Sequence, residues 1–321
     1  MRRDLLWKGL QAALGVVVLA WAALLIGSAE VLSTIGDARG LPLLAAIGAW
    51  ACVGLLLATR LWHLLARAGH RLTLSRAVGV NLAGLILSDV TPGRVGYFAV
   101  LPLLAREGVP AKKSFAIVAG TQAIELILKV MVGALAVAFL VWTLPVEPGL
   151  RTALVAGVLA LASVTLVGTA FVWGGRTATV KRVLSFLPLG SGLAERFAGM
   201  SAEARALRRE IPLIFAVSVA GLFLAGAQWW LVGQAVGLEL PFLVFVLLHP
   251  LVTALSFVPV GVAGLGIQES GLTLVLALLG APLPLALAFA LLARVTTVLA
   301  DLPGAYVVVH RAAGSYAPAV T

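Results

Sequence analysis

Long runs of apolar residues constrain what this chain can fold into more than any motif does. A helix that crosses a membrane needs about 20 mostly apolar residues. Six runs are of this kind: Leu10–Ile26, Leu41–Ala58, Phe115–Trp142, Thr152–Trp173, Leu213–Val236 and Pro284–Val309. Hydrophobic residues make up 61% of the chain and charged residues 11%, whereas soluble domains have about 45–50% and about 25%. The sequence therefore predicts an all-α, polytopic membrane protein of about six full spans.

Two further apolar stretches, Ala77–Leu104 and Pro241–Leu279, are each interrupted near the middle. Short cytoplasmic loops accumulate Lys and Arg. If the first stretch enters from the cytoplasm and turns back, 18 of the 23 Lys and Arg residues, Arg60 among them, lie in the cytoplasm with both termini. If it crosses the membrane instead, the later basic clusters fall outside. We therefore predict that the first stretch is a re-entrant helical hairpin.

The second stretch contains no Lys or Arg, which fits a hairpin that enters from the outer face. If both arms of this stretch crossed the membrane instead, the helices that follow would have the same orientation. With either form, residues 1–142 and 152–309 show the same order of elements in opposite orientations, within a single domain over residues 1–321. Many secondary transporters are built from such inverted-topology repeats. We predict an inverted repeat.

A weak sequence correspondence at a constant offset of 172 supports the repeat. Gly108 and Pro110 align with Gly280 and Pro282 at this offset. Three polar residues on the following helix also align in pairs, each triplet on one helical face: Gln122, Glu125 and Lys129 with Arg294, Thr297 and Asp301.

The net charge of +10 has an explanation that needs no nucleic acid, because most bases lie in the predicted cytoplasmic loops. The longest loop, residues 174–212, contains an amphipathic helical pattern between Leu193 and Ile211. Such a helix can lie in the inner membrane interface or pack on the underside of the protein. A metal site is not expected, because the four histidines have no ligand spacing and Cys52 is the only cysteine.

The break in the first stretch is a candidate anion site. Irregular backbone at membrane depth is tolerated only inside protein or beside a watery cavity. Thr91 can cap the second arm, Gly93 allows close approach of a neighbouring backbone, and Arg94 would stand beside the free amides of the helix start. A phosphate suits this corner. Alternatively, Arg94 pairs with Asp89 or Glu269 and only braces the hairpin.

The second break ends in Gln268 and Glu269, which complete the candidate substrate site with Arg294. Glu269 could take a proton, accept a hydrogen bond from the other hairpin, or be a helix-start carboxylate favoured by the dipole. The aligned polar residues of the spans are candidates for coupling or for lining the cavity: Gln122, Glu125, Lys129 and Asp301. Glu125 and Lys129 are also spaced for an i, i+4 ion pair.

The chain resembles the lysylphosphatidylglycerol synthase transmembrane (flippase-like) family. The resemblance covers most of the chain and is best at these segments: Arg60–Leu65, Asn81–Gly96 with its Thr-Pro-Gly-Arg turn, Glu125, Pro259–Gly271 and Gly280–Arg294. Family members usually place an acidic residue after the glycine of the first turn, where this chain has Tyr97. At the offset of 172, Tyr97 aligns with Glu269, so one of two symmetric acids is missing.

The resemblance implies movement of lipids or polyprenyl-linked carriers across the bilayer. In aminoacylating members the synthase is a separate soluble domain, and this chain has no room for one. We therefore expect a stand-alone translocator of an anionic phospholipid or polyprenyl phosphate lipid in the cell membrane, without a cofactor. The alternatives are an integral membrane enzyme acting on lipid head groups, and an accessory protein that positions a lipid-modifying enzyme.

Overall fold

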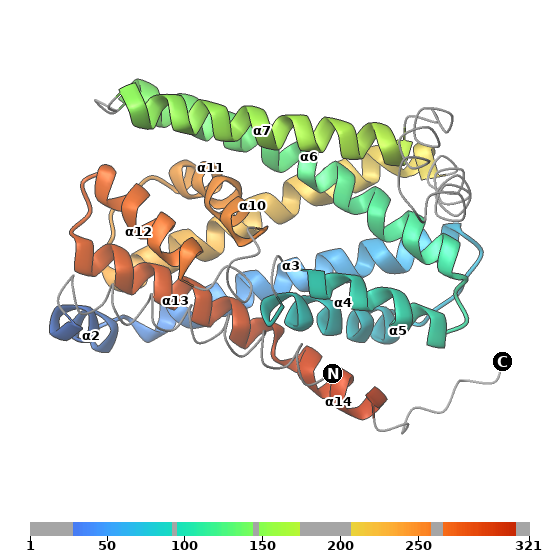
Figure 1. Cartoon of the computed structure of the whole chain (residues 1–321). Helices are drawn as coiled ribbons and strands as arrows, with labels where there is room; N and C mark the ends of the chain where they lie inside the picture. Colours follow the sequence, from blue (N-terminus) through green and yellow to red (C-terminus); the bar gives the residue numbers. More distant parts are fainter. Residues whose placement is uncertain (1–27, 92–94, 144–147, 174–206, 258–265, 313–321) are drawn as a thin grey trace, which may run out of the picture.

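The computed structural model describes residues 28–91, 95–143, 148–173, 207–257 and 266–312, and every element in them is helical (Figure 1). The all-α prediction is confirmed. The α-helices are α2 (Ser28–Gly36), α3 (Gly40–Arg67), α4 (Leu74–Asp89), α5 (Val100–Arg106), α6 (Ala111–Thr143), α7 (Pro148–Trp173), α10 (Ile211–Val236), α11 (Phe242–Thr253), α12 (Ile267–Leu278), α13 (Leu283–Asp301) and α14 (Pro303–Ala312). Short 3-10 helices are η1 (Val95–Ala99), η2 (Leu207–Glu210) and η3 (Ala254–Phe257).

Four of the described helices are long and apolar enough to cross a membrane: α3, α6, η2 with α10, and α13. Each corresponds to one of the predicted spans. The predicted span Thr152–Trp173 forms α7, which lies along α6 (Figure 1). The predicted span Leu10–Ile26 and most of the predicted amphipathic helix, up to residue 206, lie outside the described residues.

Large apolar side chains point outward from these helices. Leu44 on α3, Leu135 on α6 and Leu159 on α7 are each more than 60% exposed. Water would disfavour such surfaces, whereas lipid tails are as apolar as these side chains. Long apolar helices with apolar outer faces make this a multi-pass membrane protein.

The last predicted span, Pro284–Val309, is not continuous. Helix α13 ends at Asp301, and α14 begins at Pro303 with a different direction (Figure 1). Proline has no N–H to donate and its ring clashes with the preceding turn, so it fits the first position of a new helix better than the middle of an old one. Helix α14 then packs on α4, where Gly304 lies against the backbone of Leu82 and Ala83.

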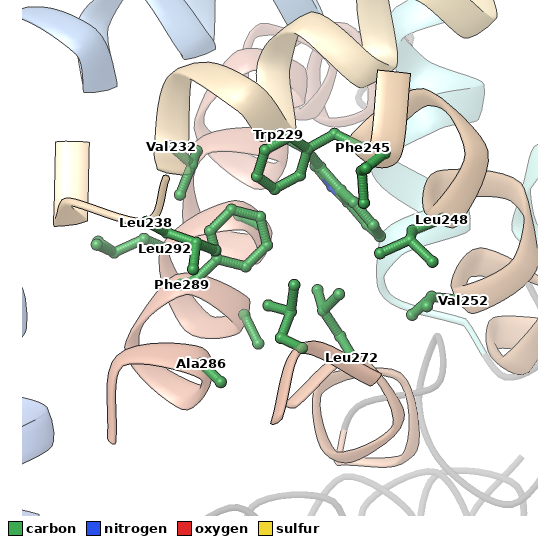
Figure 2. Packing of buried hydrophobic residues seen from close by; sticks show 14 of the residues in the cluster. Trp229, Val232, Leu238, Phe245, Leu248, Val252, Leu272, Ala286, Phe289 and Leu292 are labelled. Atoms are coloured by element: carbon green, nitrogen blue, oxygen red, sulfur yellow. The ribbon is translucent and has the colours of Figure 1, made fainter. Parts of the chain in front are cut away.

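The apolar core has two main parts, one in each half of the chain. In the second half, α10, α11 and α13 meet around Trp229, Phe245 and Phe289 (Figure 2). The rings of Phe245 and Phe289 stack with centroids 5.6 Å apart. In the first half, Leu64 and Leu104 are fully buried in a separate cluster that joins α3, α5 and α6. Helices α3 and α10 pack along each other and join the halves.

Residues Leu74–Arg106 form a helical hairpin, called hairpin one, in which η1 and α5 return along α4. Gly84 and Gly96 let the arms touch, because a methyl group on Gly96 would collide with the carbonyl of Leu87. The Thr91 hydroxyl donates to the Leu87 carbonyl at 2.8 Å and accepts from the Gly96 amide at 2.7 Å. At about 1.5 Å per residue, the 16-residue α4 is shorter than the bilayer core of about 30 Å.

Residues Phe242–Leu278 contain the second pair of short arms, called hairpin two. Helices α11 and α12 have 12 residues each, and α12 packs against η3 with Gly271 beside Leu255. Neither helix alone is long enough to cross a bilayer. Residues 258–265, which include most of the predicted break, lie outside the described residues.

Helix bounds in the two halves follow the same spacing. The second arm of each hairpin spans Val95–Arg106 and Ile267–Leu278, and the next helices begin at Ala111 and Leu283. Each pair of bounds differs by 172. The intervening turns contain Gly108 and Gly280, whose φ angles of 79° and 91° lie in the left-handed region that favours glycine.

Candidate functional site

A cavity of about 140 Å³, called the first cavity, lies in the helix bundle between hairpin one and helices α3, α6 and α10, with a mostly apolar wall that carries a few polar and charged side chains. Hairpin one contributes Ser88 and Tyr97 to its wall, and α6 contributes Glu125 and Lys129. Hairpin two reaches the same cavity through His249 on α11. Side chains from both hairpins therefore line one space.

The charges beside the first cavity form a cluster. Glu125 and Lys129 line the cavity, and Arg60, which does not line it, pairs with Glu125. Arg60 Nη2 donates to Glu125 Oε1 at 2.6 Å, and Lys129 Nζ lies 3.9 Å from Glu125 Oε2. The side chain of Arg60 is 2% exposed, that of Glu125 13% and that of Lys129 31%. Arg60 Nη1 also donates to Ser218 Oγ at 3.3 Å. The pair between Glu125 and Lys129 matches their sequence spacing, but Arg60 lies closer.

Sequence reasoning placed Arg60 in a loop after the second span, whereas the structure places it within a helix. Helix α3 does not end with the apolar run at Ala58 but continues to Arg67, so Arg60 lies inside the helix. A helical pattern could have shown this. Arg60 follows Val53 by seven residues and precedes Leu64 by four, which puts all three on one face, and all three are buried.

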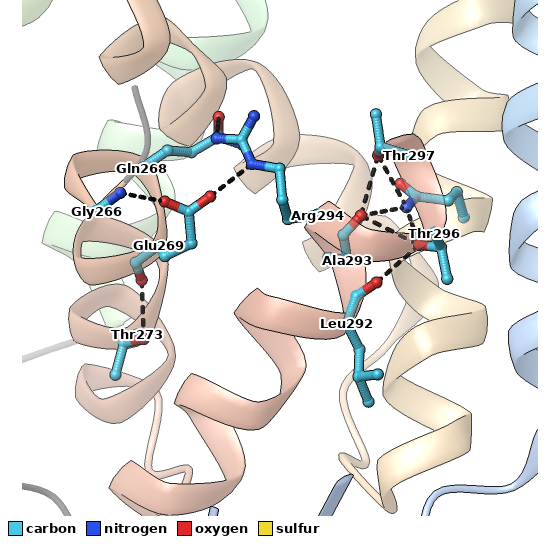
Figure 3. A network of polar contacts seen from close by, with 10 residues as sticks. Gly266, Gln268, Glu269, Thr273, Leu292, Ala293, Arg294, Thr296 and Thr297 are labelled. Carbon is cyan, nitrogen blue, oxygen red and sulfur yellow. Dashed lines mark hydrogen bonds and ion pairs between the residues drawn. The ribbon is translucent and has the colours of Figure 1, made fainter. Parts of the chain in front are cut away.

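A second polar cavity, of about 20 Å³, lies between α12 and α13 and is called the second cavity. Its charges are fully engaged with each other (Figure 3). Arg294 Nε donates to Glu269 Oε1 at 2.7 Å, and the Gly266 amide donates to Glu269 Oε2 at 2.7 Å. Arg294 Nη2 donates to Gln268 Oε1 at 3.0 Å. Glu269 is thus a helix-start carboxylate and also the ion-pair partner of Arg294.

Trp50 and His249 line both cavities and separate them. Trp50 Nε1 donates to Asp301 Oδ2 at 3.1 Å, and the His249 ring contacts the Trp229 ring edge-on with centroids 4.8 Å apart. Asp301 is 1% exposed, so this hydrogen bond is shielded from water. The wall between the cavities is a layer of aromatic rings, and Asp301 on α13 holds Trp50 in place within it.

The remaining predicted residues occupy different places. Gln122 lines the first cavity, and Asp89 is half-buried at the end of α4. Gly93 and Arg94 lie outside the described residues. Thr91 does cap the second arm of hairpin one through the Gly96 amide, so that amide is already engaged.

Sequence reasoning missed one further buried polar group, Gln228 on α10. Its Nε2 donates to Thr296 Oγ1 at 2.8 Å and to the Ala293 carbonyl at 3.0 Å, which ties α10 to α13. Among the residues that the structure describes, no three His, Cys, Asp or Glu side chains gather where a metal ion could bind.

No curated protein and no solved structure matches the chain. A family match covers residues 10–303, which include both hairpins, both cavities and the helices that frame them. The matched family is the lysylphosphatidylglycerol synthase TM region, whose members are membrane proteins linked to lipid handling. Since the match spans most of the sequence, this chain belongs to the lysylphosphatidylglycerol synthase TM region family.

Proposed function

We propose that the chain is a lipid translocator, a flippase that moves an anionic phospholipid or a polyprenyl-phosphate-linked lipid across the cell membrane. The head group passes through the first cavity while the tails stay in the bilayer. The cluster of Arg60, Glu125 and Lys129 carries this proposal, because two cations share one carboxylate beside an open space. Charged side chains inside a membrane are costly and mark substrate or ion pathways.

The charge balance of the cluster favours an anionic guest. A phosphate entering the first cavity would meet Lys129, whose side chain is the most exposed of the three. At an effective dielectric near 20, a unit charge about 4 Å away contributes about 4 kcal/mol of attraction. Ser88 and Tyr97 lie in the same wall, where the Tyr97 hydroxyl donates to Asn81 Oδ1 at 3.1 Å.

The two hairpins are proposed to be re-entrant and related by an inverted repeat. Their short arms support the first point, and the helix bounds that differ by 172 support the second. Gly54 and Gly226 add to this support, since they also differ by 172. Gly54 faces Leu82 on α4, and Gly226 faces Val246 on α11, so each lets a span approach the first arm of a hairpin.

A change of shape is part of the proposal. Ligand pockets are usually about 300–1,000 Å³, whereas the first cavity has about 140 Å³. It therefore fits a phosphate group but not a whole glycerol or sugar head group. Hairpin one and hairpin two would have to separate for a complete head group to pass, with the wall of Trp50 and His249 opening between the cavities.

The test is head-group exposure in proteoliposomes. Liposomes carry phosphatidylglycerol with a fluorescent head group, and a membrane-impermeant reductant bleaches the label in the outer leaflet. The wild-type protein should let the reductant bleach the inner-leaflet label as well, and Lys129→Gln should slow this. Arg151→Gln is the matched control, because Arg151 is an exposed base on α7 away from the cavity. Wild-type vesicles that behave like empty ones would contradict the proposal and favour an enzyme or an accessory protein.

A labelling experiment tests the re-entrant arrangement with cytoplasmic termini. Single cysteines at Arg76, in the first turn of hairpin one, and at Lys112, at the start of α6, should both react only with reagent on the cytoplasmic side. Reaction from opposite sides would mean that hairpin one crosses the membrane, and the inverted repeat would be lost with it.

A further inference from the structure

A third polar cavity, of about 380 Å³ and called the end cavity, lies where several long helices begin or end. It is framed by the end of α3, the first turns of α6, and η2 before α10, on the right of Figure 1. It shares no lining residue with the first or second cavity. Neither the translocation path proposed above nor the family match assigns it a role.

The charges that line the end cavity are mainly positive. Three cations come from three separate elements, Arg67 from α3, Lys113 from α6 and Arg209 from η2, and the single carboxylate is Glu210. Arg67 Nε donates to Glu210 Oε1 at 2.8 Å, and His63 Nε2 lies 3.2 Å from Glu210 Oε2. The carboxylate is therefore already shared, and the positive charges exceed the negative ones in the lining.

Donor groups remain on these cations. Lys113 Nζ donates to the Ala68 carbonyl at 3.0 Å, where it satisfies the end of α3. An ammonium has three N–H donors and a guanidinium five. Arg67 is 60% exposed along its side chain, so its guanidinium can also reach a ligand while its Nε holds Glu210. A phosphate oxygen is the acceptor that such a convergent set suits best.

The rest of the lining is apolar, which favours a phosphate that belongs to a lipid over a free phosphate. Ala116 and Ile117 on α6 and Leu207 on η2 share the wall with the cations. A free inorganic phosphate gains nothing from such a wall, whereas the glycerol and upper acyl carbons of a phospholipid do. The position also fits, because these helices leave their apolar runs here. Basic pockets between membrane helices on the cytoplasmic side bind anionic head groups.

We infer that the end cavity binds the head group of an anionic phospholipid, such as phosphatidylglycerol, in the leaflet on that side. The phosphate lies between Lys113, Arg67 and Arg209, and the glycerol backbone lies at the apolar side of the lining. This binding needs no translocation and is separate from the first cavity.

The experiment uses the purified full chain in a neutral detergent and follows its thermal unfolding while lipid is added. Phosphatidylglycerol should raise the melting temperature, and phosphatidylcholine and inorganic phosphate should not. Arg209→Gln should weaken the apparent affinity for phosphatidylglycerol about fivefold, which corresponds to about 1 kcal/mol for one cation near the surface. Arg209→Lys should restore most of it. Arg209 is chosen because it is exposed, whereas Lys113 also holds the end of α3.

Two controls keep this inference apart from the proposed function. Arg71→Gln removes an exposed base in the loop after α3 that does not line the end cavity, and should leave the affinity unchanged. Lys129→Gln alters the first cavity and separates the two sites: Arg209→Gln should weaken binding as strongly on the Lys129→Gln background as in the wild type. If Arg71→Gln weakens binding as much as Arg209→Gln, the attraction is general and the site is refuted. If only Lys129→Gln weakens it, the lipid binds in the first cavity. An equal rise in melting temperature with inorganic phosphate would mean that the end cavity binds a free anion and not a lipid head group.

Discussion

The two halves of this molecule each bury an arginine–carboxylate pair, but the pairs stand in different surroundings. In the first half, Glu125 borders a cavity of about 140 Å³ together with a second cation, Lys129, while its partner Arg60 does not line the cavity. In the second half, Arg294 and Glu269 border a cavity of about 20 Å³, room for about one water. The first pair lies beside the larger space and near a further cation, Lys129, whereas the second pair lies only beside the small cavity.

The pairs also occupy positions that do not correspond at the offset of 172. Glu269 and Arg294 align with Tyr97 and Gln122, both neutral and both on the wall of the first cavity. Tyr97 donates to Asn81 Oδ1 at 3.1 Å, and so joins the arms of hairpin one without any charge. The first half therefore has no ion pair at the positions that correspond to Glu269 and Arg294. In the second half, called the closed half, the charged pair lines a small cavity, whereas in the first half, called the open half, the carboxylate of the pair lines a larger one.

The largest expected effect is on the closed half. Arg294→Met should lower the free energy of unfolding by about 3–5 kcal/mol, because it leaves a buried carboxylate uncompensated; Glu269 is 2% exposed along its side chain. Thermal and denaturant unfolding in detergent measure this. The double variant Arg294→Met with Glu269→Leu should regain most of the lost free energy of unfolding. A stable single variant would mean that water reaches Glu269, and the contrast between the halves would fail.

The same change in the open half should cost less. Arg60→Met leaves Glu125 with Lys129 and with water in the first cavity, so we expect a loss of about 1–3 kcal/mol. The two variants are compared under identical detergent conditions. The order of the two losses is the critical result, and a larger loss for Arg60→Met would reverse the interpretation of the cavities.

Glycines at corresponding positions offer a purely steric comparison. A methyl group on Gly226 would collide with Val246, including its backbone Cα, whereas on Gly54 it would meet only the flexible end of Leu82. Overpacking costs about 1–3 kcal/mol, and alanine regains about 1 kcal/mol of helix propensity. Gly226→Ala should therefore destabilise the protein by up to about 2 kcal/mol and Gly54→Ala by almost nothing. Equal melting temperatures would show that the two contacts do not differ in tightness.

The smallest effect on stability should come with a clear effect on transport. Lys129→Gln removes a partly exposed i, i+4 pair, which is worth about 0.3–0.5 kcal/mol. If Lys129 binds the head group, the variant should lose about 1.5 kcal/mol of a charge-assisted hydrogen bond, and transport should fall about tenfold. Liposome transport and unfolding are measured on one preparation. A normal transport rate with normal stability would remove Lys129 from the site.

The sequence predicted the helices better than it predicted the contacts. Apolar runs, and prolines at Pro110 and Pro282 before α6 and α13, mark the helices because they depend on local chemistry. The pairing of Glu125 with Lys129 was predictable from i, i+4 spacing alone. The shorter contact from Arg60 joins residues 65 positions apart, so only the packing of α3 on α6 could reveal it. The bend at Pro303 had a local signal, but the apolar run continued through it.

The bend between α13 and α14 also bears on the order in which the protein is assembled. Hairpin one is synthesised early, yet the last described helix covers part of it: Gly304 lies against the α4 backbone, and Val307 lies near Gly79. Contacts between distant parts of a chain form late and slow folding. The face of α4 that α14 covers therefore stays without this partner until the second half has been synthesised. A nascent chain stalled before α14 should expose that face to proteases and insertion factors. A truncation or a destabilising substitution in α14 should therefore first increase the protease sensitivity of hairpin one, in the N-terminal half.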